Sequence, residues 1–405
     1  METTSIDCGL RIADCGLADS RVPVRIRNPK SEIRNRAFTL VELLVVITII
    51  SVLAALITVA AIGALKKARE AQIKAELNQI ATAVDDYKNK TTAYPPNCQT
   101  DGSSGPLDDA GITNDVRRHI KQLAPRTAEP DDWALVLTGQ APVNTAGSRI
   151  IFTAPANKYL AGGISAGEAV VFWLGGFSSD PKYPLSGEGG PSYDVTGSSA
   201  TDRRLKDPIE SRKWIFPFDV SRLGPRAADG YFDESAGRYL EFTVTVNGVQ
   251  KLRRINFWQY MPPKSTQPYF YFDTSRHPAG VMSGSNVAGP YDPPAATADS
   301  KLGPSGTDLP VYAFKKMNPS YSSSSSGTTP CLTFVNPDKY QVIHCGLDGT
   351  WDSDNFDAFK KMTAGAGVTN NASNFLLFPT GPFVGDVADT IVNFTPETRI
   401  EDAQK

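Results

Sequence analysis

The chain has 405 residues, with 41 lysines and arginines against 43 aspartates and glutamates, and therefore a formal net charge of −2. This balance argues against a protein that binds nucleic acid through a basic surface. Together with 33 glycines, the hydrophobic fraction of 40% is that of a globular protein, and three histidines offer little material for a histidine-driven catalytic centre. We therefore expect a folded protein without a nucleic-acid partner.

A long apolar segment lies near the start of the chain. Residues 43–65 are 23 residues without a charge, rich in leucine, isoleucine, valine and alanine. As a helix with a rise of about 1.5 Å per residue, this segment is about 34 Å long, which is enough to cross a hydrocarbon core of about 30 Å. It is too long for the apolar core of a secretory signal. The segment predicts a single transmembrane helix over 43–65.

The residues before this segment are basic. Residues 21–36 contain six basic side chains against one acid. The positive-inside rule then places the N-terminus in the cytoplasm and the remaining chain across the membrane. We expect a single-pass membrane protein whose globular domain lies across the membrane from the cytoplasm.

A short motif stands where the basic and apolar segments meet. Residues 36–43 read Arg-Ala-Phe-Thr-Leu-Val-Glu-Leu. This sequence resembles the leader motif of type IV pilin and type II secretion pseudopilin precursors. The resemblance implies a cytoplasmic leader over 1–37, cleavage by prepilin peptidase between Ala37 and Phe38, and N-methylation of Phe38. The family has glycine before the cut, and Ala37 departs from that pattern.

Glu42 is a carboxylate at the edge of the apolar segment. Such a charge costs about 2.5–3.5 kcal/mol at the bilayer centre and therefore usually has a partner. The α-amine of Phe38 is the available cation, either within one helix or from an incoming subunit of a filament. We therefore assign filament assembly to Phe38 and Glu42. The alternative is that Glu42 only reaches back to the membrane interface.

The helix is expected to continue beyond the membrane. No proline interrupts residues 38–93, and Pro95 follows. The part over 66–90 is expected to be amphipathic, with charged side chains on its exposed surface, among them Glu70 and Lys74 as a pair four residues apart. An apolar stripe with spacings of three and four residues consists of Ile73, Leu77, Ile80, Val84 and Tyr87.

The remaining residues, 94–405, are long enough for a substantial globular domain. The apolar residues Val116, Ile120 and Leu123 predict one helix, and capping and breaking residues predict two more, after Pro130 and from Ser165 to Gly175. Alternating patterns predict strands on both sides of the turn Asn247-Gly248 and over 269–272, 332–335 and 340–344. Loops rich in proline, glycine and serine are expected at 278–308 and 318–329. The fold class is α+β, with the long N-terminal helix packed on an antiparallel sheet, as in pilins.

The C-terminal part carries a second resemblance. Residues 336–349 run from a predicted strand into Gly-Leu-Asp-Gly, which is similar to the end of major pseudopilins. The resemblance implies a calcium ion in the acidic loop that follows. Calcium takes six to eight oxygen ligands. The alternative is an acidic turn without an ion. The candidate ligands are Asp348, Asp352, Asp354 and Asp357.

Three cysteines remain after removal of the leader, and they would lie in an oxidising compartment. Cys331 and Cys345 are disulfide candidates, because they would close a 15-residue segment and stabilise the fold by about 3 kcal/mol. The odd number leaves at least one thiol, such as Cys98, free or paired with another chain.

One motif suggests an enzyme. Gly163 to Gly167 matches G-x-S-x-G, the nucleophile elbow of α/β-hydrolases. No clear strand precedes it, and Ser165 with Glu168 fits a helix capping box equally well. We expect no enzymatic activity, and we keep a signal-anchored periplasmic hydrolase or binding protein as an alternative.

The predicted function is that of a structural subunit of a type II secretion pseudopilus. The resemblance implies other pilin or pseudopilin subunits, an assembly ATPase and an inner-membrane platform protein as partners. The soluble region is longer than is usual for a major subunit of the family. This length leaves open a minor, tip-located or initiating role. A type IV pilus subunit is a further alternative, because the leaders of the two systems read alike.

Overall fold

The structure of the protein is a computed structural model, and the chain forms two compact units, Met1–Ala60 and Ala61–Lys405. The structure describes residues 39–98, 109–145, 147–152, 160, 162–195, 209, 212–276, 281–283, 286–288, 313–319, 332–347, 377–381, 383 and 385–404.

Helix α1 is the longest element and comprises Leu40–Thr91. It forms because residues 38–93 contain no proline and are rich in good helix formers. The helix ends where Thr92 adopts a left-handed φ of 67°, with its N–H group still bound to the carbonyl oxygen of Lys88 at 2.7 Å. The predicted stop at Pro95 therefore comes shortly after the true end.

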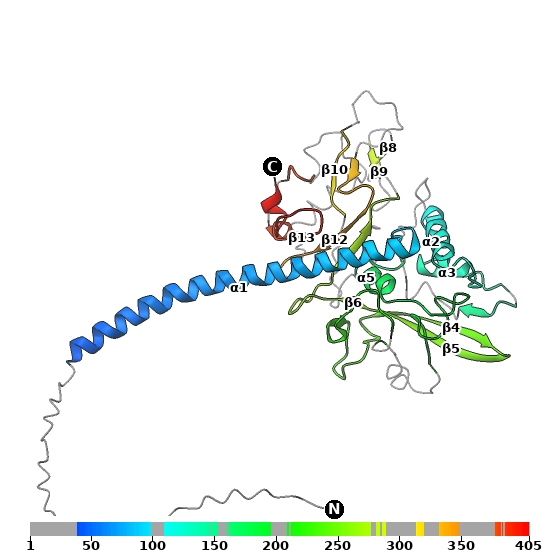
Figure 1. Cartoon of the computed structure of the whole chain (residues 1–405), viewed down its shortest axis with the longest axis horizontal. Coiled ribbons are helices and arrows are strands. Elements are labelled where there is room, and N and C mark those ends of the chain that lie inside the picture. Colours follow the sequence, from blue (N-terminus) through cyan, green and yellow to red (C-terminus); the bar gives the residue numbers. More distant parts are fainter. Residues whose placement is uncertain are drawn as a thin grey trace, which may run out of the picture. The chain divides into compact units, whose positions relative to one another are not determined.

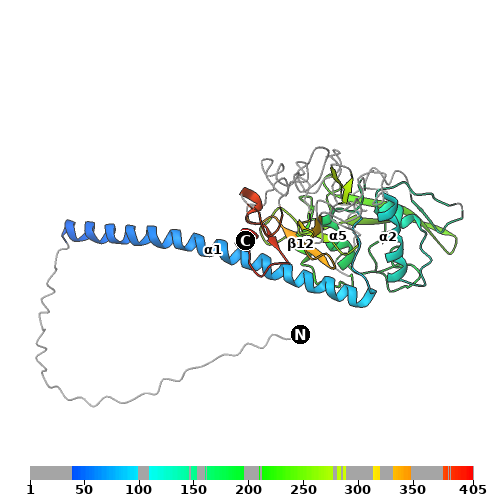
Figure 2. The ribbon, with the colours of Figure 1, turned by 90° about the horizontal axis from the view of Figure 1, so that it is seen from above.

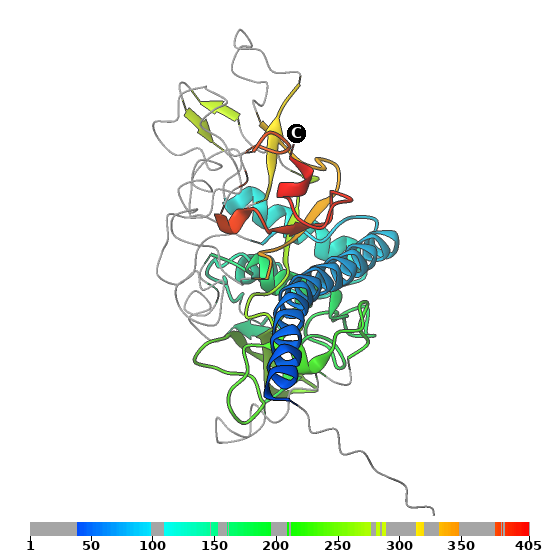
Figure 3. The same ribbon diagram turned by 90° about the vertical axis from the view of Figure 1, so that its left-hand side faces the viewer.

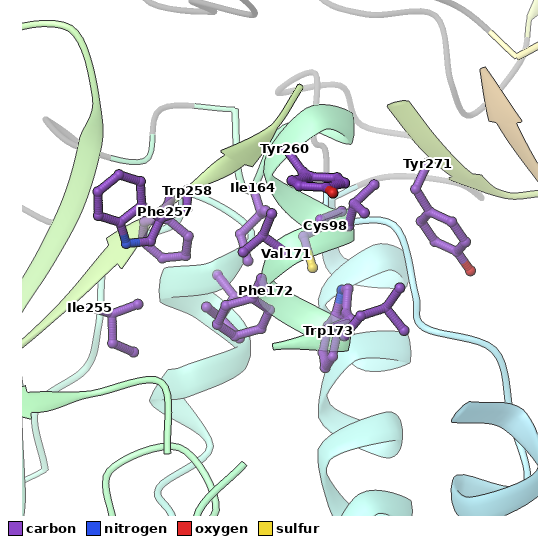
Figure 4. Packing of buried hydrophobic residues seen from close by; sticks show 14 of the residues in the cluster. Cys98, Ile164, Val171, Phe172, Trp173, Ile255, Phe257, Trp258, Tyr260 and Tyr271 are labelled. Carbon is purple, nitrogen blue, oxygen red and sulfur yellow. The ribbon is translucent and has the colours of Figure 1, made fainter. Parts of the chain in front are cut away.

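Three further α-helices confirm the three helices predicted after residue 94. They are α2 (Asp109–Leu123), α3 (Asp132–Leu137) and α5 (Ala166–Leu174). Every side chain of α5 is buried, as expected of a helix that is apolar on all sides. Figure 4 shows this helix at the centre of the core, with Val171, Phe172 and Trp173 pointing into the surrounding apolar cluster.

The largest sheet is antiparallel and has the strand order β1-β4-β5-β2. Its centre is the predicted hairpin, in which Asn247 (φ 52°) and Gly248 (φ 79°) form a two-residue turn with positive φ at both positions. The alternation in β4 buries Leu240, Phe242 and Val244. The strands are β1 (Ile150–Phe152), β2 (Tyr193–Asp194), β4 (Arg238–Val246) and β5 (Val249–Phe257).

A second antiparallel sheet has the order β13-β12-β7 and brings the end of the chain onto strand β12 (Figure 3). It comprises β7 (Phe270–Asp273), β12 (Tyr340–His344) and β13 (Ile391–Val392). The first two confirm predicted strands within one residue. The sequence did not predict β13, because two residues carry no alternating pattern.

The other strands form two-stranded pairs. They are β3 (Leu223–Gly224) with β6 (Gln259–Tyr260), β8 (Val281–Ser283) with β9 (Asn286–Ala288), and β10 (Lys315–Met317) with β11 (Leu332–Phe334). The pair β8–β9 lies inside 278–308 and corrects the prediction of a loop throughout that range. Short 3₁₀ helices are η2 (Val220–Arg222), η4 (Gly385–Val387) and η5 (Glu401–Ala403).

Within the second unit, α1 lies against α5 and β12 (Figures 1 and 2). The ring of Tyr87 packs edge-on against that of Trp173, with ring centroids 6.4 Å apart. The hydroxyl group of Tyr340 donates to the carbonyl oxygen of Ala81 at 2.6 Å. The fold is therefore α+β, with the long helix packed on a domain of antiparallel sheets, as predicted.

Candidate processing and assembly site

The described part of the motif begins at Thr39. Ala37 and Phe38, which the sequence assigns to cleavage and methylation, lie outside the described residues, and both assignments stay predictions. Glu42 is described, and it lies in the first turn of α1.

Thr39 and Glu42 form a capping box at the start of α1. The backbone N–H of Glu42 donates to Thr39 Oγ1 at 3.2 Å, and the backbone N–H of Thr39 donates to Glu42 Oε2 at 3.0 Å. The Thr39 hydroxyl group also donates to Glu42 Oε2 at 3.0 Å. This reciprocal pattern satisfies N–H groups that a helix start leaves unbound, and a negative charge at this end is favourable. The carboxylate of Glu42 is thus held against its own helix.

Our sequence reasoning missed the role of Thr39. The signal was present, because threonine followed three residues later by glutamate is the sequence pattern of a capping box. The prediction gave Glu42 a single kind of partner, the amine of Phe38. The structure adds a partner that is present in the uncleaved chain.

The first part of α1 presents an apolar surface. Its most apolar 18-residue window has a mean hydropathy of 3.0 and is entirely exposed, and within the described residues α1 is the one helix apolar enough to cross a membrane. Its hydroxyl groups bind the helix backbone: Thr48 to Val45, Ser51 to Ile47 and Thr58 to Ala54, at 2.6–2.8 Å. Polar groups in lipid must be satisfied internally, and these are. The helix is suited to anchor the chain in a membrane.

The second part of α1 is the face on which the globular domain folds. All five residues of the predicted apolar stripe are at most 3% exposed, which confirms the stripe. Burying an aliphatic side chain of this size contributes about 1.5–3 kcal/mol, so the stripe is a major source of stability for the domain.

Glu76 lies beside the stripe and accepts four hydrogen bonds from the domain. Arg222 donates through Nη1 to Oε2 at 2.8 Å and through Nη2 to Oε1. The hydroxyl groups of Tyr260 and Tyr269 donate to Oε1 and Oε2 at 2.8 and 2.7 Å. Burial, together with the charge of Glu76, raises the pKa of Tyr269 above its usual range, which keeps this hydroxyl group a donor. The cluster ties α1 to segments 146 to 193 residues away.

The predicted surface pair of Glu70 and Lys74 is corrected by the structure. Both residues are buried, at 8% and 9% exposure. Lys74 Nζ donates to two backbone carbonyl oxygens near the C-terminus, and Glu70 Oε2 lies 3.6 Å from Arg399 Nε. The two residues lie on the stripe side of the helix, because they stand three residues before Ile73 and Leu77. The domain therefore covers them.

Ser165 is the N-cap of α5. Its hydroxyl oxygen accepts the N–H of Glu168 at 3.3 Å, and the Glu168 carboxylate accepts the N–H of Ser165 at 3.0 Å. The residue is 6% exposed, and Glu168 is further held by Arg238 at 2.9 Å. The capping interpretation of Gly163 to Gly167 is therefore confirmed. The hydroxyl group is engaged in holding a core helix.

The proposed calcium ligands Asp348, Asp352, Asp354 and Asp357 all lie outside the described residues. Among the residues that are described, no group of three or more His, Cys, Asp or Glu side chains is arranged to hold a metal.

The two residues before the acidic loop are described. The Leu347 N–H donates to Asp389 Oδ2 at 3.0 Å. Gly346 has a φ of +102°, and a Cβ atom there would lie 2.2 Å from the Asp389 carboxylate. Gly346 is thus required by both conformation and space. Asp389 places one carboxylate beside the start of the acidic loop.

Of the disulfide candidates, Cys345 is completely buried after β12, and Cys331 lies outside the described residues, so their pairing stays a prediction. Next to Cys345, His344 Nδ1 accepts the N–H of Gly346 at 3.1 Å. Burial lowers the pKa of His344 to about 4, so this imidazole is neutral and structural at physiological pH. Cys98 is a buried free thiol whose pKa is raised by burial.

Comparison with known proteins supports the interpretation of the N-terminal segment. Residues 33–58 match the model of the prokaryotic N-terminal methylation motif. No curated protein and no solved structure matches the chain. The chain therefore carries the prepilin-type motif of a type IV pilin-like or pseudopilin precursor. The motif implies processing by prepilin peptidase and assembly with other pilin subunits.

Proposed function

We propose that the protein is a structural subunit of a type II secretion pseudopilus, cut between Ala37 and Phe38 and N-methylated on Phe38. The observation that carries the proposal is the prepilin-type motif at 33–58, joined to an exposed apolar helix whose first turn holds Glu42. The first part of the long helix is apolar, and the second part packs against the globular domain. This arrangement is suited to a filament with a helical core and a globular surface.

The membrane orientation follows from charge. The basic residues of 21–36 stay in the cytoplasm, and the globular domain lies in the periplasm. Assembly then requires that the apolar helix leave the bilayer, which costs free energy in proportion to the apolar area exposed. A cytoplasmic ATPase acting through an inner-membrane platform protein supplies that work.

Glu42 and Phe38 act together in assembly. The carboxylate of Glu42 in one subunit pairs with the methylated α-amine of Phe38 in the next. In the membrane the carboxylate is held by Thr39, which lowers the cost of carrying it near lipid. In the filament it exchanges this bond for an ion pair in a low-dielectric core, where such a pair is strong.

The first experiment is expression of the full chain with and without a prepilin peptidase, followed by mass spectrometry of the N-terminal peptide. We expect a mature chain that begins with N-methylated Phe38 only when the peptidase is present. An Ala37→Gly variant is the matched control and should be cut at least as well. An uncut chain, or a cut beyond the apolar segment near Ala61, would instead indicate an anchored or secreted periplasmic protein.

A second role within the class is favoured by the size of the domain. Residues 94–405 are a longer region than a major subunit usually has after its helix, which favours a minor or tip position. A type IV pilus subunit would carry the same leader motif. Deletion of the gene in its native host distinguishes a pseudopilus subunit from a type IV pilus subunit. Loss of protein secretion with surface pili intact supports the pseudopilus, and loss of pili with secretion intact supports the type IV pilus.

We also propose that the loop after Leu347 binds calcium through Asp348, Asp352, Asp354 and Asp357. The position of Asp389 beside Leu347 supports a carboxylate-rich environment there. Isothermal titration of the full chain with Ca²⁺ should give one site that the Asp352→Asn, Asp354→Asn double variant lacks. Equal heats from both proteins would indicate an acidic turn without an ion.

A further inference from the structure

The side chain of Lys74 joins α1 to the end of the chain. Its Nζ atom donates to the backbone carbonyl oxygens of Val392 at 2.5 Å and of Thr395 at 2.6 Å, more than 300 residues away. A buried ammonium group needs strong hydrogen bonds to offset its lost hydration, and two carbonyl oxygens provide charge-assisted ones.

A second side chain on the same face of α1 contacts the same segment. Glu70, one helical turn before Lys74, lies 3.6 Å from Arg399 Nε. Arg399 also pairs with its neighbours Glu401 and Asp402. Two adjacent charged residues of α1 thus hold residues 390–404, here named the C-terminal segment, at two points.

The C-terminal segment also contacts the rest of the domain: the ring of Phe394 packs against those of Phe314 and Phe378, and the N–H of Phe383 donates to Gln404 Oε1 at 3.1 Å. Strand β13 has only two residues, and short strands are weak by themselves. Asn393 and Val342 exchange hydrogen bonds at 3.2 and 3.0 Å, and the N–H of Ile400 closes the segment on the carbonyl oxygen of Thr390 at 2.9 Å. The segment is therefore a compact unit whose polar contacts with α1, among the described residues, come from Glu70 and Lys74.

This unit also sets the position of Asp389. Ile391 and Val392 pair with His344 and Ile343, and Asp389 directly precedes the segment. The bond from the Leu347 N–H to Asp389 therefore requires that β13 stay in register with β12.

We propose that Glu70 and Lys74 form a clasp on α1 that holds the C-terminal segment closed, and that opening the clasp releases residues 389–404 together with the Asp389 contact to Leu347. The sheet around β4 and β5 stays folded when the clasp opens. Whether residues 389–404 stay folded then depends on how α1 packs against the domain. This inference does not depend on the proposed role in secretion.

Hydrogen exchange followed by mass spectrometry tests the clasp in the full chain in detergent micelles. The variant is Lys74→Met, which keeps the length of the side chain but leaves two buried carbonyl oxygens without a donor. We expect exchange in peptides covering 389–404 to become at least about tenfold faster, with β4 and β5 unchanged. Lys67→Met is the matched control, because Lys67 is exposed on the same helix, and it should change neither region.

Unchanged exchange over 389–404 in Lys74→Met would overturn the clasp. If Lys74→Met unfolds as a whole, the Arg399→Gln variant tests the clasp instead. It weakens the second attachment and leaves Lys74 in place. Faster exchange confined to 389–404 supports the proposal. No change, or a general increase over the whole domain, overturns it.

Discussion

The hydroxyl group of Thr39 lies 3.0 Å from a carboxylate oxygen of Glu42, and the same oxygen accepts the Thr39 N–H at 3.0 Å. Glu42 therefore has a partner within its own chain before any second subunit is present. A neighbouring amine has to compete with Thr39 for this carboxylate. The charge of the amine gives it the advantage once water is excluded.

The first prediction concerns Glu42→Val. Removing the carboxylate leaves the apolar helix longer and without charge, so insertion into the membrane is expected to remain intact. The partner of the incoming amine is lost, so filament assembly is expected to fail. Membrane extraction with carbonate measures insertion, and electron microscopy of sheared cells measures filaments.

Thr48→Val is the matched control for this variant. It removes a hydroxyl group that binds only the helix backbone, at Val45, and should assemble normally. Normal filaments from Glu42→Val would exclude the assigned role of the carboxylate. Loss of membrane insertion would instead make Glu42 a determinant of anchoring.

Short-range sequence patterns correctly predicted several parts of the fold. The capping box at Ser165, the turn at Asn247-Gly248 and the strand Tyr340–His344 each depend on residues close together in sequence. The apolar stripe on α1 was predictable for the same reason, because helical spacing alone places its members on one face.

The contacts between α1 and the domain were not predictable in this way. Glu76 and Arg222 are 146 residues apart, and Lys74 and Val392 are 318 residues apart, so no local pattern pairs them. Charged residues near the membrane were expected on the surface because an unpaired buried charge is costly. Partners distant in sequence remove that cost, and a single sequence does not reveal them.

The second prediction concerns Glu76→Gln. The variant keeps the shape of the side chain but leaves Asp219, 3.4 Å from Arg222 Nε, as the remaining carboxylate partner of the Arg222 guanidinium. We expect the free energy of unfolding to fall by about 2 kcal/mol, because hydrogen bonds to a charged carboxylate are replaced by weaker ones to a neutral amide. Chemical unfolding of the full chain in detergent, followed by tryptophan fluorescence, measures the loss.

Asp86→Asn is the control, because Asp86 is an exposed acid on the same helix. Its effect should stay within about 0.5 kcal/mol. If the two variants are equally stable, the hydrogen bonds to Glu76 contribute nothing net to the attachment of the domain to α1.

The third prediction separates a capping role of Ser165 from a catalytic one. Ser165→Ala should lower the free energy of unfolding by about 1 kcal/mol, and Ser165→Asn should restore most of it, because asparagine also caps helices well. Esterase activity towards a small activated ester is the second measurement. An activity of the wild-type chain that both variants lose would revive the hydrolase alternative.

The fourth prediction concerns the pH dependence of stability due to Lys74. Burial lowers its pKa from 10.5 to about 8, against the opposing effect of the nearby Glu397. Glu70 lies one helical turn before Lys74 and faces Arg399, whose charge is also shared with Glu401 and Asp402. Below the folded-state pKa, Lys74 carries its proton in both states, and its buried charge opposes folding.

Between about pH 8 and 10.5 the unfolded chain holds a proton that the folded chain has lost, so the contribution of Lys74 to the free energy of unfolding rises with pH. We therefore expect the free energy of unfolding of the wild type, measured relative to that of Lys74→Met, to rise between about pH 7 and about pH 9.5. The difference between the two proteins removes the titration of other groups, and Lys67→Met should follow the wild type. Parallel curves for the wild type and Lys74→Met would mean that the two carbonyl oxygens keep the folded-state pKa of Lys74 close to its unfolded value.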